Sequence, residues 1–288
     1  MSTAPLPSLE SDLPPEALRV LSHARRLTTP CGDGDLVWHV WGNDAHQPLV
    51  LLHGGSGSWT HWIRNVEALA AAGRRVVVPD LPGFGDSARP PGGQDVDAVA
   101  PAVAAGLRQF CGESPLDIAG FSFGGLCGAL IAADHPARVR RLLLIGAPGL
   151  GLRSKRLPLT SWRDAPTEEG KLAAHRANLA TLMIHGPDAI DDLALRLQAA
   201  NVPRDRMHRR KLALTDLLLQ KLPQIRCPMD AIYGERDALY RETLEELKVR
   251  LGRAPTLGEL VLIPGAGHWA PYEAAPVCNR EMLRLLAA

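Results

Sequence analysis

The 288-residue sequence predicts an α/β fold in which a mostly parallel sheet of eight strands lies between layers of helices. Three observations predict it: short runs of branched or Leu residues alternate with helical stretches, these runs are apolar almost throughout, and glycine-rich loops follow them. Nearly continuous apolar strands are typical of parallel sheets covered on both faces. Right-handed crossovers then bring the loops after the strands to one edge, where ligands bind in such folds.

The strands are expected in the following places. Residues 25–29 and 36–41 should pair as a hairpin, because the Cys-Gly-Asp-Gly-Asp stretch between them tolerates the positive φ of a tight turn. A loose helix at residues 13–24 precedes this hairpin. Six further strands are expected at residues 48–52, 75–78, 116–119, 139–145, 228–233 and 259–263.

Helices are expected between these strands. They lie near residues 62–72, 96–110, 126–133 and 241–251, with a closing helix from residue 273. From about residue 150 the alternation stops, and three helical stretches follow at residues 168–183, 189–201 and 206–221. We therefore predict a core domain of residues 1–150 and 223–288, into which residues 151–222 are inserted as a helical cap.

Composition and charge exclude several classes of partner. Hydrophobic residues make up 46% of the chain and charged residues 22%, and the formal net charge is +1. The sequence contains no basic cluster with interleaved aromatic residues, which would indicate nucleic-acid binding. Apolar runs are far shorter than the ~20 residues of a membrane span, and no secretory signal is visible. We expect a small-molecule substrate and neither a nucleic-acid nor a membrane partner.

The five cysteines are scattered, odd in number and form no CxxC pair. This pattern argues against a disulfide framework and a thiolate zinc site, and it favours a reducing cytoplasm. We expect a cytoplasmic protein without a metal or cofactor. The sequence does not indicate an oligomeric state.

The motif Gly120-Phe121-Ser122-Phe123-Gly124 has the form G-x-S-x-G. It follows an expected strand and precedes an expected helix, which is the setting of a sharp turn that exposes a nucleophilic serine. The glycines leave room for strained backbone at Ser122, and the positive end of the following helix points at its hydroxyl. The alternative is a serine that caps the helix. We predict that Ser122 is a nucleophile.

A base and an acid are expected at the same edge of the sheet. His268 follows the last strand in Ile-Pro-Gly-Ala-Gly-His-Trp, and Asp237 follows the preceding strand in Tyr-Gly-Glu-Arg-Asp. Glu235 is the competing carboxylate, but it lies closer to the strand end. The order Ser122, Asp237, His268 along the chain is the order expected of this architecture. A loop histidine bonded only to backbone is the alternative for His268.

Acyl transfer also needs N–H donors that bind the developing oxyanion. One should be the backbone N–H of Phe123, directly after the nucleophile. The second should come from the loop His-Gly-Gly-Ser-Gly after the strand at residues 48–52, and we select Gly55. His53 is expected to brace this loop.

From about Leu36 to the C-terminus the chain resembles the α/β-hydrolase superfamily. Four motifs in order carry the resemblance: HGGSGSW, PDLPGFGDS, GFSFGG and GERD…GAGHW. It implies an α/β-hydrolase fold with a Ser-His-Asp triad. Asp80 and Asp86 of the second motif are expected to tie turns.

Within the superfamily, SWTHW and GHWAPYE are similar to hydrolases that cleave meta-ring-fission products at a carbon–carbon bond. Those enzymes carry Asn before the nucleophile, where this chain has Phe121, and a cap Arg for the substrate carboxylate. Gln198 occupies that cap position, with Arg196 and Arg204 nearby. Ester hydrolysis is therefore expected ahead of C–C hydrolysis. Relatives with an Asp nucleophile and the HGGPG peptidases are excluded by their motifs.

The leading hypothesis is a serine hydrolase that acts on a small carboxylic ester through an acyl-enzyme. The alternatives are C–C hydrolysis and a non-catalytic protein that binds a ligand in the same fold. Large side chains near the catalytic loops or in the cap are candidates for the substrate pocket; they are Trp59, Trp62, Phe121, Met183, Gln198 and Trp269. The basic residues of the cap are expected on a solvated helix face; they include Arg204, Arg206, Arg209, Arg210 and Lys211.

Overall fold

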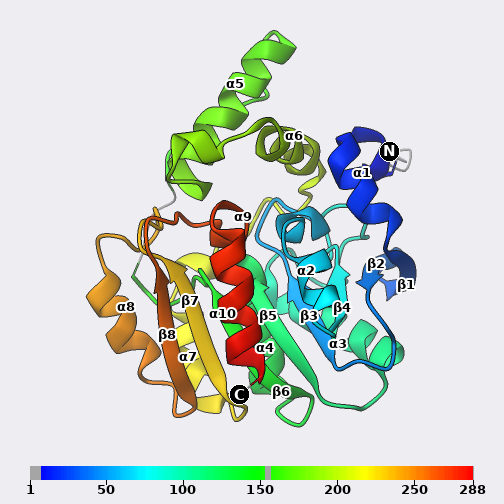
Figure 1. Cartoon of the computed structure of the whole chain (residues 1–288), viewed down its shortest axis with the longest axis vertical. Coiled ribbons are helices and arrows are strands. Elements are labelled where there is room, and N and C mark those ends of the chain that lie inside the picture. Colours follow the sequence, from blue (N-terminus) through cyan, green and yellow to red (C-terminus); the bar gives the residue numbers. More distant parts are fainter. Residues whose placement is uncertain (1–7, 153–156, 288) are drawn as a thin grey trace.

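The computed structural model describes residues 8–152 and 157–287, and its centre is an eight-stranded sheet (Figure 1). The strands are β1 (Arg25–Cys31), β2 (Gly34–Trp41), β3 (Pro48–Leu52), β4 (Arg75–Pro79), β5 (Leu116–Phe121), β6 (Val139–Ile145), β7 (Met229–Gly234) and β8 (Leu257–Ile263). Their order is β1-β2-β4-β3-β5-β6-β7-β8. Strand β2 is antiparallel to β1 and β4, and the other neighbours are parallel. The predicted fold class is confirmed.

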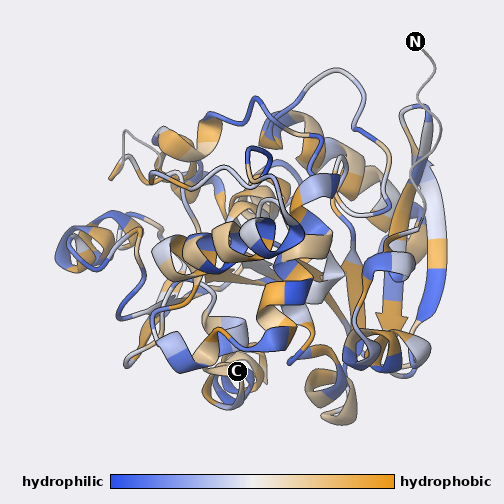
Figure 2. Cartoon of the chain, turned by 90° about the horizontal axis from the view of Figure 1, so that it is seen from above, coloured by the Kyte–Doolittle hydropathy of each residue, from blue (hydrophilic) through white to orange (hydrophobic). Residues whose placement is uncertain are grey.

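The expected hairpin closes where Cys31 pairs with Gly34. Gly32, in the turn, has a φ of 56°, a conformation that glycine adopts without steric cost. Strand β1 ends the sheet, and Figure 2 shows hydrophilic residues along it. Charged residues on an edge strand discourage pairing with another chain.

Helices cover both faces of the sheet. One face carries α3 (Val96–Cys111), α4 (Phe123–Asp134), α7 (Leu217–Lys221) and α8 (Leu244–Leu251), which share one hydrophobic core. The other face carries α1 (Pro15–Ser22), α2 (Val66–Ala71), α9 (Ala270–Glu273) and α10 (Ala275–Ala287), which share a second core. Short turns complete these layers at η1 (Leu9–Asp12) and η2 (Trp59–Trp62). Covering layers on both faces explain why the parallel strands are apolar throughout.

The chain between β6 and β7 is helical, as predicted for residues 168–183 and 189–201, but it contains more and shorter elements than the sequence predicts. They are α5 (Glu168–Asn178), the π-helical turn η3 (Leu179–Met183), η4 (Pro187–Ala189), α6 (Asp192–Asn201), η5 (Val202–Arg204), η6 (Leu212–Leu214), α7 and η7 (Leu222–Gln224). Helices α5 and α6 lie beyond the edge of the sheet, next to α9 (Figure 1). This edge is where the carboxyl ends of the parallel strands meet.

The continuous helix predicted at residues 206–221 is wrong. The N–H of Arg206 donates to the carbonyl of Gly83 at 3.0 Å, and the N–H groups of Lys211 and Leu212 donate to the Asp95 carboxylate at 2.5 and 2.9 Å. The N–H groups of Lys211 and Leu212 are therefore not free for the bonds of a helix over these residues, and the chain follows the surface of the core instead. In the described part of the chain, no helix is long and apolar enough to span a membrane.

Candidate active site

Ser122 occupies a sharp turn between β5 and α4. Its φ of 50° and ψ of −118° are rare for a residue with a side chain and store strain at this position. A Cβ on Gly120 would collide with the carbonyl of Gly124, and one on Gly124 with the carbonyl of Leu52. Both glycines of the motif are thus required by close backbone packing. The turn leaves the Ser122 side chain partly exposed at the mouth of a cavity.

The side chains of Ser122, His268 and Asp237 form a continuous chain of hydrogen bonds. His268 Nε2 lies 2.9 Å from Ser122 Oγ, and His268 Nδ1 lies 2.8 Å from Asp237 Oδ2. Asp237 is fully buried, and its other oxygen accepts the N–H of Leu239 at 2.8 Å. Because this carboxylate accepts a hydrogen bond from Nδ1–H, the imidazole proton stays on Nδ1, and Nε2 is left free to accept the proton of the serine hydroxyl.

Glu235, the competing acid, lies on the other side of this loop. Its carboxylate accepts the N–H of Gly265 at 3.2 Å, and its side chain is 45% exposed. It therefore supports the turn before His268 and makes no contact with the imidazole among the described interactions. The geometry favours Asp237 as the partner of His268.

His53 orients the peptide group that carries the Gly55 N–H. Its Nδ1 donates to the carbonyl of Gly54 at 2.7 Å, and its Nε2 accepts the N–H of Leu81 at 2.8 Å. A trans peptide is planar, so fixing the Gly54 carbonyl also fixes the direction of the Gly55 N–H on the opposite side. Burial lowers the pKa of His53 to about 4, although Asp80 opposes this change. The imidazole is thus held neutral, as both hydrogen bonds require.

His61 lies behind the same loop. Its Nδ1 accepts the N–H of Gly54 at 3.2 Å, and its ring packs against Phe121 and Trp269. Burial, together with the neighbouring His53 and His268, lowers its pKa well below the ordinary value. Gly54 thus uses its own N–H in this contact, whereas the Gly55 N–H makes no hydrogen bond within residues 8–152 and 157–287.

Phe123 is the first residue of α4, so its N–H has no acceptor within the helix. Both Gly55 and Phe123 line the cavity that contains Ser122. Two N–H groups without helical or loop acceptors, on either side of a serine, can bind an oxyanion.

The cavity beside Ser122 has a volume of about 500 Å³. Most of its lining is apolar and comes from the catalytic loops and from residues 157–214; it includes Pro148, Leu157, Leu159, Leu182, Met183, Met207, Ala213, Leu214 and Leu239. Phe121 and Met183 line it, as the sequence suggests. Asp205, His208 and Arg210 add polar groups to the same wall.

The other four pocket candidates do not line this cavity. Trp59 and Trp62 are almost fully buried, where Trp59 packs against Trp41 and Trp62 against Phe121. Trp269 stacks on Tyr272, and its indole N–H donates to the carbonyl of His61 at 2.8 Å. These tryptophans therefore support the loops from behind. Gln198 lies on α6, away from the cavity lining.

The basic residues between β6 and β7 do not share one solvated face. Arg204 is buried and bonds Asp86 at 3.2 Å and Asp12 at 2.7 Å. Arg206 donates to the carbonyl of Ser87 at 2.5 Å. The prediction of a solvated helix face is therefore wrong for Arg204, Arg206 and Arg210, which lies at the cavity. Arg209 and Lys211 are exposed as expected. Arg196 is exposed and pairs with Asp192, so it does not reach the cavity.

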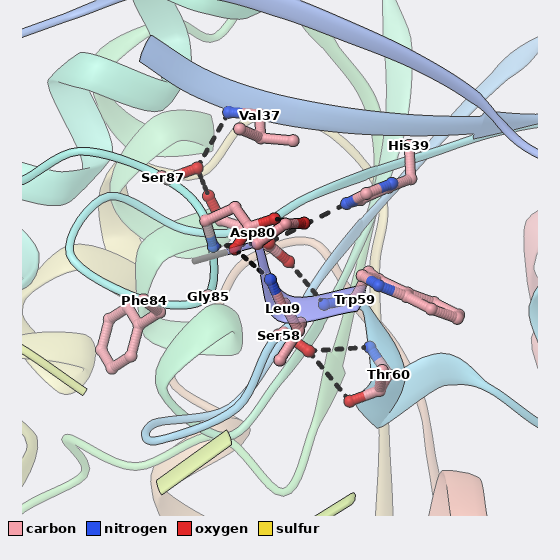
Figure 3. Close-up of polar contacts among 12 residues, drawn as sticks. Leu9, Val37, His39, Ser58, Trp59, Thr60, Asp80, Phe84, Gly85 and Ser87 are labelled. Atoms are coloured by element: carbon pink, nitrogen blue, oxygen red, sulfur yellow. Dashed lines mark hydrogen bonds and ion pairs between the residues drawn. The ribbon is translucent and has the colours of Figure 1, made fainter. Parts of the chain in front are cut away.

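Asp80 holds together the loops beneath the site (Figure 3). It is fully buried and accepts the N–H of Trp59 at 2.9 Å and of Asp86 at 3.0 Å. Burial opposes its ionisation, but the nearby His39 and the N–H of Asp86 outweigh burial and lower its pKa. Asp86 itself accepts the N–H of Leu9 at 2.7 Å. Both aspartates are thus structural, and Asp86 joins the N-terminal segment to the core.

Glu273 makes contacts between two loops that the sequence did not predict. Its carboxylate accepts the N–H of Gly267 at 2.7 Å, of Gly186 at 2.6 Å and of His185 at 3.1 Å. It therefore joins the loop that carries His268 to the segment after η3. Its place in the GHWAPYE stretch was a signal for a loop contact, although its partners at residues 185–186 are distant in sequence.

No group of three or more His, Cys, Asp or Glu side chains in the described residues is arranged to hold a metal ion. The groups gathered at the cavity are a serine hydroxyl, a histidine hydrogen-bonded to a carboxylate, and two backbone N–H groups. Such a set is suited to nucleophilic attack on a carbonyl with proton transfer.

Comparison with known proteins gives consistent matches. The model of the "Alpha/beta hydrolase family" matches residues 49–280. The chain is 29% identical to the dihydrolipoyllysine-residue acetyltransferase component of the acetoin cleaving system of Pseudomonas putida, over 87% of this chain and 66% of that protein. It thus spans just under two thirds of that relative's length.

Two further matches cover most of the partner chain. The 2-hydroxy-6-oxononadienedioate/2-hydroxy-6-oxononatrienedioate hydrolase of Burkholderia vietnamiensis is 30% identical over 85% of this chain and 88% of that protein. The crystal structure of carboxylesterase CesB (YbfK) from Bacillus subtilis has a TM-score of 0.74 at 19% identity, covering 94% of this chain and 95% of that one. The second likeness is one of fold.

Proposed function

The chain belongs to the alpha/beta hydrolase family, and we propose that it is a serine hydrolase that cleaves small carboxylic esters through an acyl-enzyme. One observation carries the proposal: Ser122 Oγ, the His268 imidazole and the Asp237 carboxylate form an unbroken hydrogen-bonded chain at the mouth of a cavity. The arrangement matches the needs of acyl transfer in both geometry and charge.

In the first step Ser122 Oγ attacks the ester carbonyl while His268 Nε2 takes its proton. Asp237 keeps the other imidazole proton on Nδ1 and stabilises the imidazolium that forms. His268 then donates its proton to the leaving alcohol, and the ester bond breaks. Water, activated by the same imidazole, hydrolyses the acyl-enzyme.

The N–H groups of Gly55 and Phe123 are the proposed oxyanion donors. Removing one such donor costs about 2.7–4 kcal/mol of transition-state stabilisation in a well-studied protease. The positive end of α4 adds to this field, because Phe123 begins that helix.

Residues 151–222 are proposed as the cap that selects the substrate. Within the described part, Leu157, Leu159, Leu182 and Met183 contribute apolar surface to the cavity. An apolar wall favours an acyl or alcohol group of the same character. The large cavity leaves room for substrates beyond an acetyl ester.

Carbon–carbon bond hydrolysis is the second candidate, favoured by the name of the Burkholderia vietnamiensis relative. Phe121 stands where such enzymes carry Asn, and Gln198 does not line the cavity. Both differences remove polar contacts that a dienoate would use. Ester hydrolysis therefore remains the first choice.

The test compares the purified protein with Ser122→Ala on p-nitrophenyl acetate, p-nitrophenyl butyrate and a ring-fission product. We expect ester hydrolysis by the natural protein and a loss of about 10⁴-fold or more in kcat in the variant. Equal rates in both would overturn the nucleophile assignment. Turnover of the ring-fission product alone would favour the second candidate, and a serine silent to a fluorophosphonate probe would favour a non-catalytic ligand-binding protein.

A further inference from the structure

A carboxylate from the chain between β6 and β7 reaches the loop that carries Gly55. Asp205, which directly follows η5, accepts a hydrogen bond from the hydroxyl of Ser56 at 2.5 Å through Oδ2. The two residues are 149 positions apart in the sequence. Ser56 is the immediate neighbour of Gly55, so the contact acts on the proposed oxyanion loop.

Ser56 needs this support because of its backbone. Its φ of 56° is left-handed, and it and Ser122 are the two non-glycine residues with a positive φ in the described ranges. A side chain in that conformation costs on the order of 1 kcal/mol. The bond to Asp205 offsets the cost and holds the chain in the turn that follows Gly55.

Arg210 completes the contact on the other side. Its guanidinium donates to Asp205 Oδ1 at 3.1 Å and Oδ2 at 2.8 Å, and to Ser56 Oγ at 3.3 Å. A Cβ built on Gly55 would lie 3.3 Å from the same guanidinium, so the group packs directly against Gly55. Asp205 thus holds both Ser56 and the side chain that covers Gly55.

Asp205 is itself held in place by the core. The next residue, Arg206, donates its N–H to Gly83, and the side chain of Met207 is fully buried against the same glycine. The N–H of Met207 donates to Asp205 Oδ1 at 2.8 Å. Burial alone would raise the pKa of Asp205, but Arg210 and Ser56 outweigh it and lower the pKa. The support is therefore both rigid and charged.

We propose that Asp205 is a positioning residue that, through Ser56 and Arg210, aims the Gly55 N–H at the oxyanion. The inference rests on the proposed serine hydrolase function and deepens it. It assigns to the chain between β6 and β7 a part in transition-state stabilisation in addition to its contact with substrate. Asp205 takes no proton and touches no reacting atom in this role.

Three variants test the link: Asp205→Asn, Ser56→Ala and Ser56→Gly. Asp205→Asn and Ser56→Ala should each lower kcat on p-nitrophenyl butyrate by roughly tenfold with little change in KM, less than the loss of a whole donor. The dissociation constant of butylboronic acid, which forms a tetrahedral adduct with the nucleophile, should rise by a similar factor. Ser56→Gly should retain more activity than Ser56→Ala, because glycine adopts the same φ without strain.

A double variant and a control sharpen the result. Ser56→Ala combined with Asp205→Asn should cost little more than the larger single effect, because both remove one link. Asp192→Asn breaks an exposed ion pair with Arg196 on α6 and should leave kcat unchanged. Near-UV circular dichroism checks that the three variants at positions 56 and 205 are folded. If Asp205→Asn does not fold, the comparison of kcat between Ser56→Gly and Ser56→Ala still tests the inference.

Two outcomes would overturn the inference. If Asp205→Asn and Ser56→Ala keep natural kcat and boronic acid affinity while Ser122→Ala is inactive, the positioning role is wrong and the hydrolase stands. If the natural protein neither hydrolyses the esters nor reacts with a fluorophosphonate, the proposed function fails, and the inference fails with it.

Discussion

The sheet core and the chain between β6 and β7 reach the same cavity by different means. In the core, Ser122, Asp237 and His268 follow β5, β7 and β8, so strand pairing fixes where each loop begins. Residues 146–152 and 157–228, the described part of the chain between β6 and β7, contain no strand and lie against the core through side-chain and backbone contacts. The core thus supplies the groups that would react, and the other region constrains them.

These constraints act on both sides of the nucleophile. On the side of the base, the N–H of Trp269 donates to the carbonyl of Met183 at 2.6 Å, and Glu273 binds the N–H groups of residues 185–186. On the oxyanion side, Asp205 holds Ser56. A region that fixes both the loop of His268 and the loop of Gly55 is expected to act as a structural part of the site.

The largest effect should come from the core. Asp237→Asn keeps the shape of the side chain but removes the charge and disturbs the tautomer of His268. By analogy with serine proteases, kcat should fall by about 10⁴-fold. Steady-state kinetics on p-nitrophenyl butyrate measures this. Glu235→Gln is the matched control, because Glu235 lies two residues earlier and is 45% exposed, and this variant should stay active. Equal losses of kcat in the two variants would contradict the assignment of Asp237 as the acid.

An intermediate effect is expected on stability as a function of pH. Burial lowers the pKa of His53 to about 4, and it also lowers the pKa of His61 well below the ordinary value of histidine. In the unfolded chain the histidines have a pKa near 6.5, so between pH 6.5 and 4 the unfolded chain binds more protons than the folded protein. The contribution of the neutral, buried histidines to the free energy of unfolding is therefore full above pH 6.5 and is lost as the pH falls towards 4. For His53 the loss approaches about 3 kcal/mol.

Urea unfolding at several pH values between 7 and 4 measures this change. His53→Asn should show a shallower decline in the free energy of unfolding, because it has one buried imidazole fewer. The exposed His46→Asn is the matched control. A decline of equal steepness in His53→Asn and in the natural protein would contradict the lowering of the pKa of His53 by burial.

The smallest effect should come from breaking the contact between the two regions. Glu273→Gln replaces a carboxylate that accepts three N–H groups by an amide with one acceptor oxygen, so at least one partly buried donor loses its partner. We expect about 1–3 kcal/mol of lost stability and a fall in kcat of roughly tenfold from a misplaced His268. Glu259→Gln, an exposed partner of Arg284, is the control. If Glu273→Gln keeps the kcat of the natural protein, the contact between the two regions does not affect catalysis.

Local patterns were sufficient for the core. Ser122 could be located because a G-x-S-x-G motif between a strand and a helix requires glycines at two points of backbone contact, and both contacts are present. Asp237 and His268 were located from their positions after strands. Trp59 and Trp269 were misplaced in the pocket, because size and proximity in sequence do not say which way a ring packs.

The sequence by itself determined the α/β architecture, the eight strands and the loops on which Ser122, Asp237 and His268 lie, because strand periodicity and glycine contacts are local. The tertiary structure alone decided the course of residues 205–212, where backbone N–H groups donate to Gly83 and Asp95 and not to carbonyls of the same segment. It also decided that Asp205 meets Ser56 and that Glu273 meets residues 185–186. Those partners are distant in the chain, and a polar group finds its partner only after the core has brought the two together.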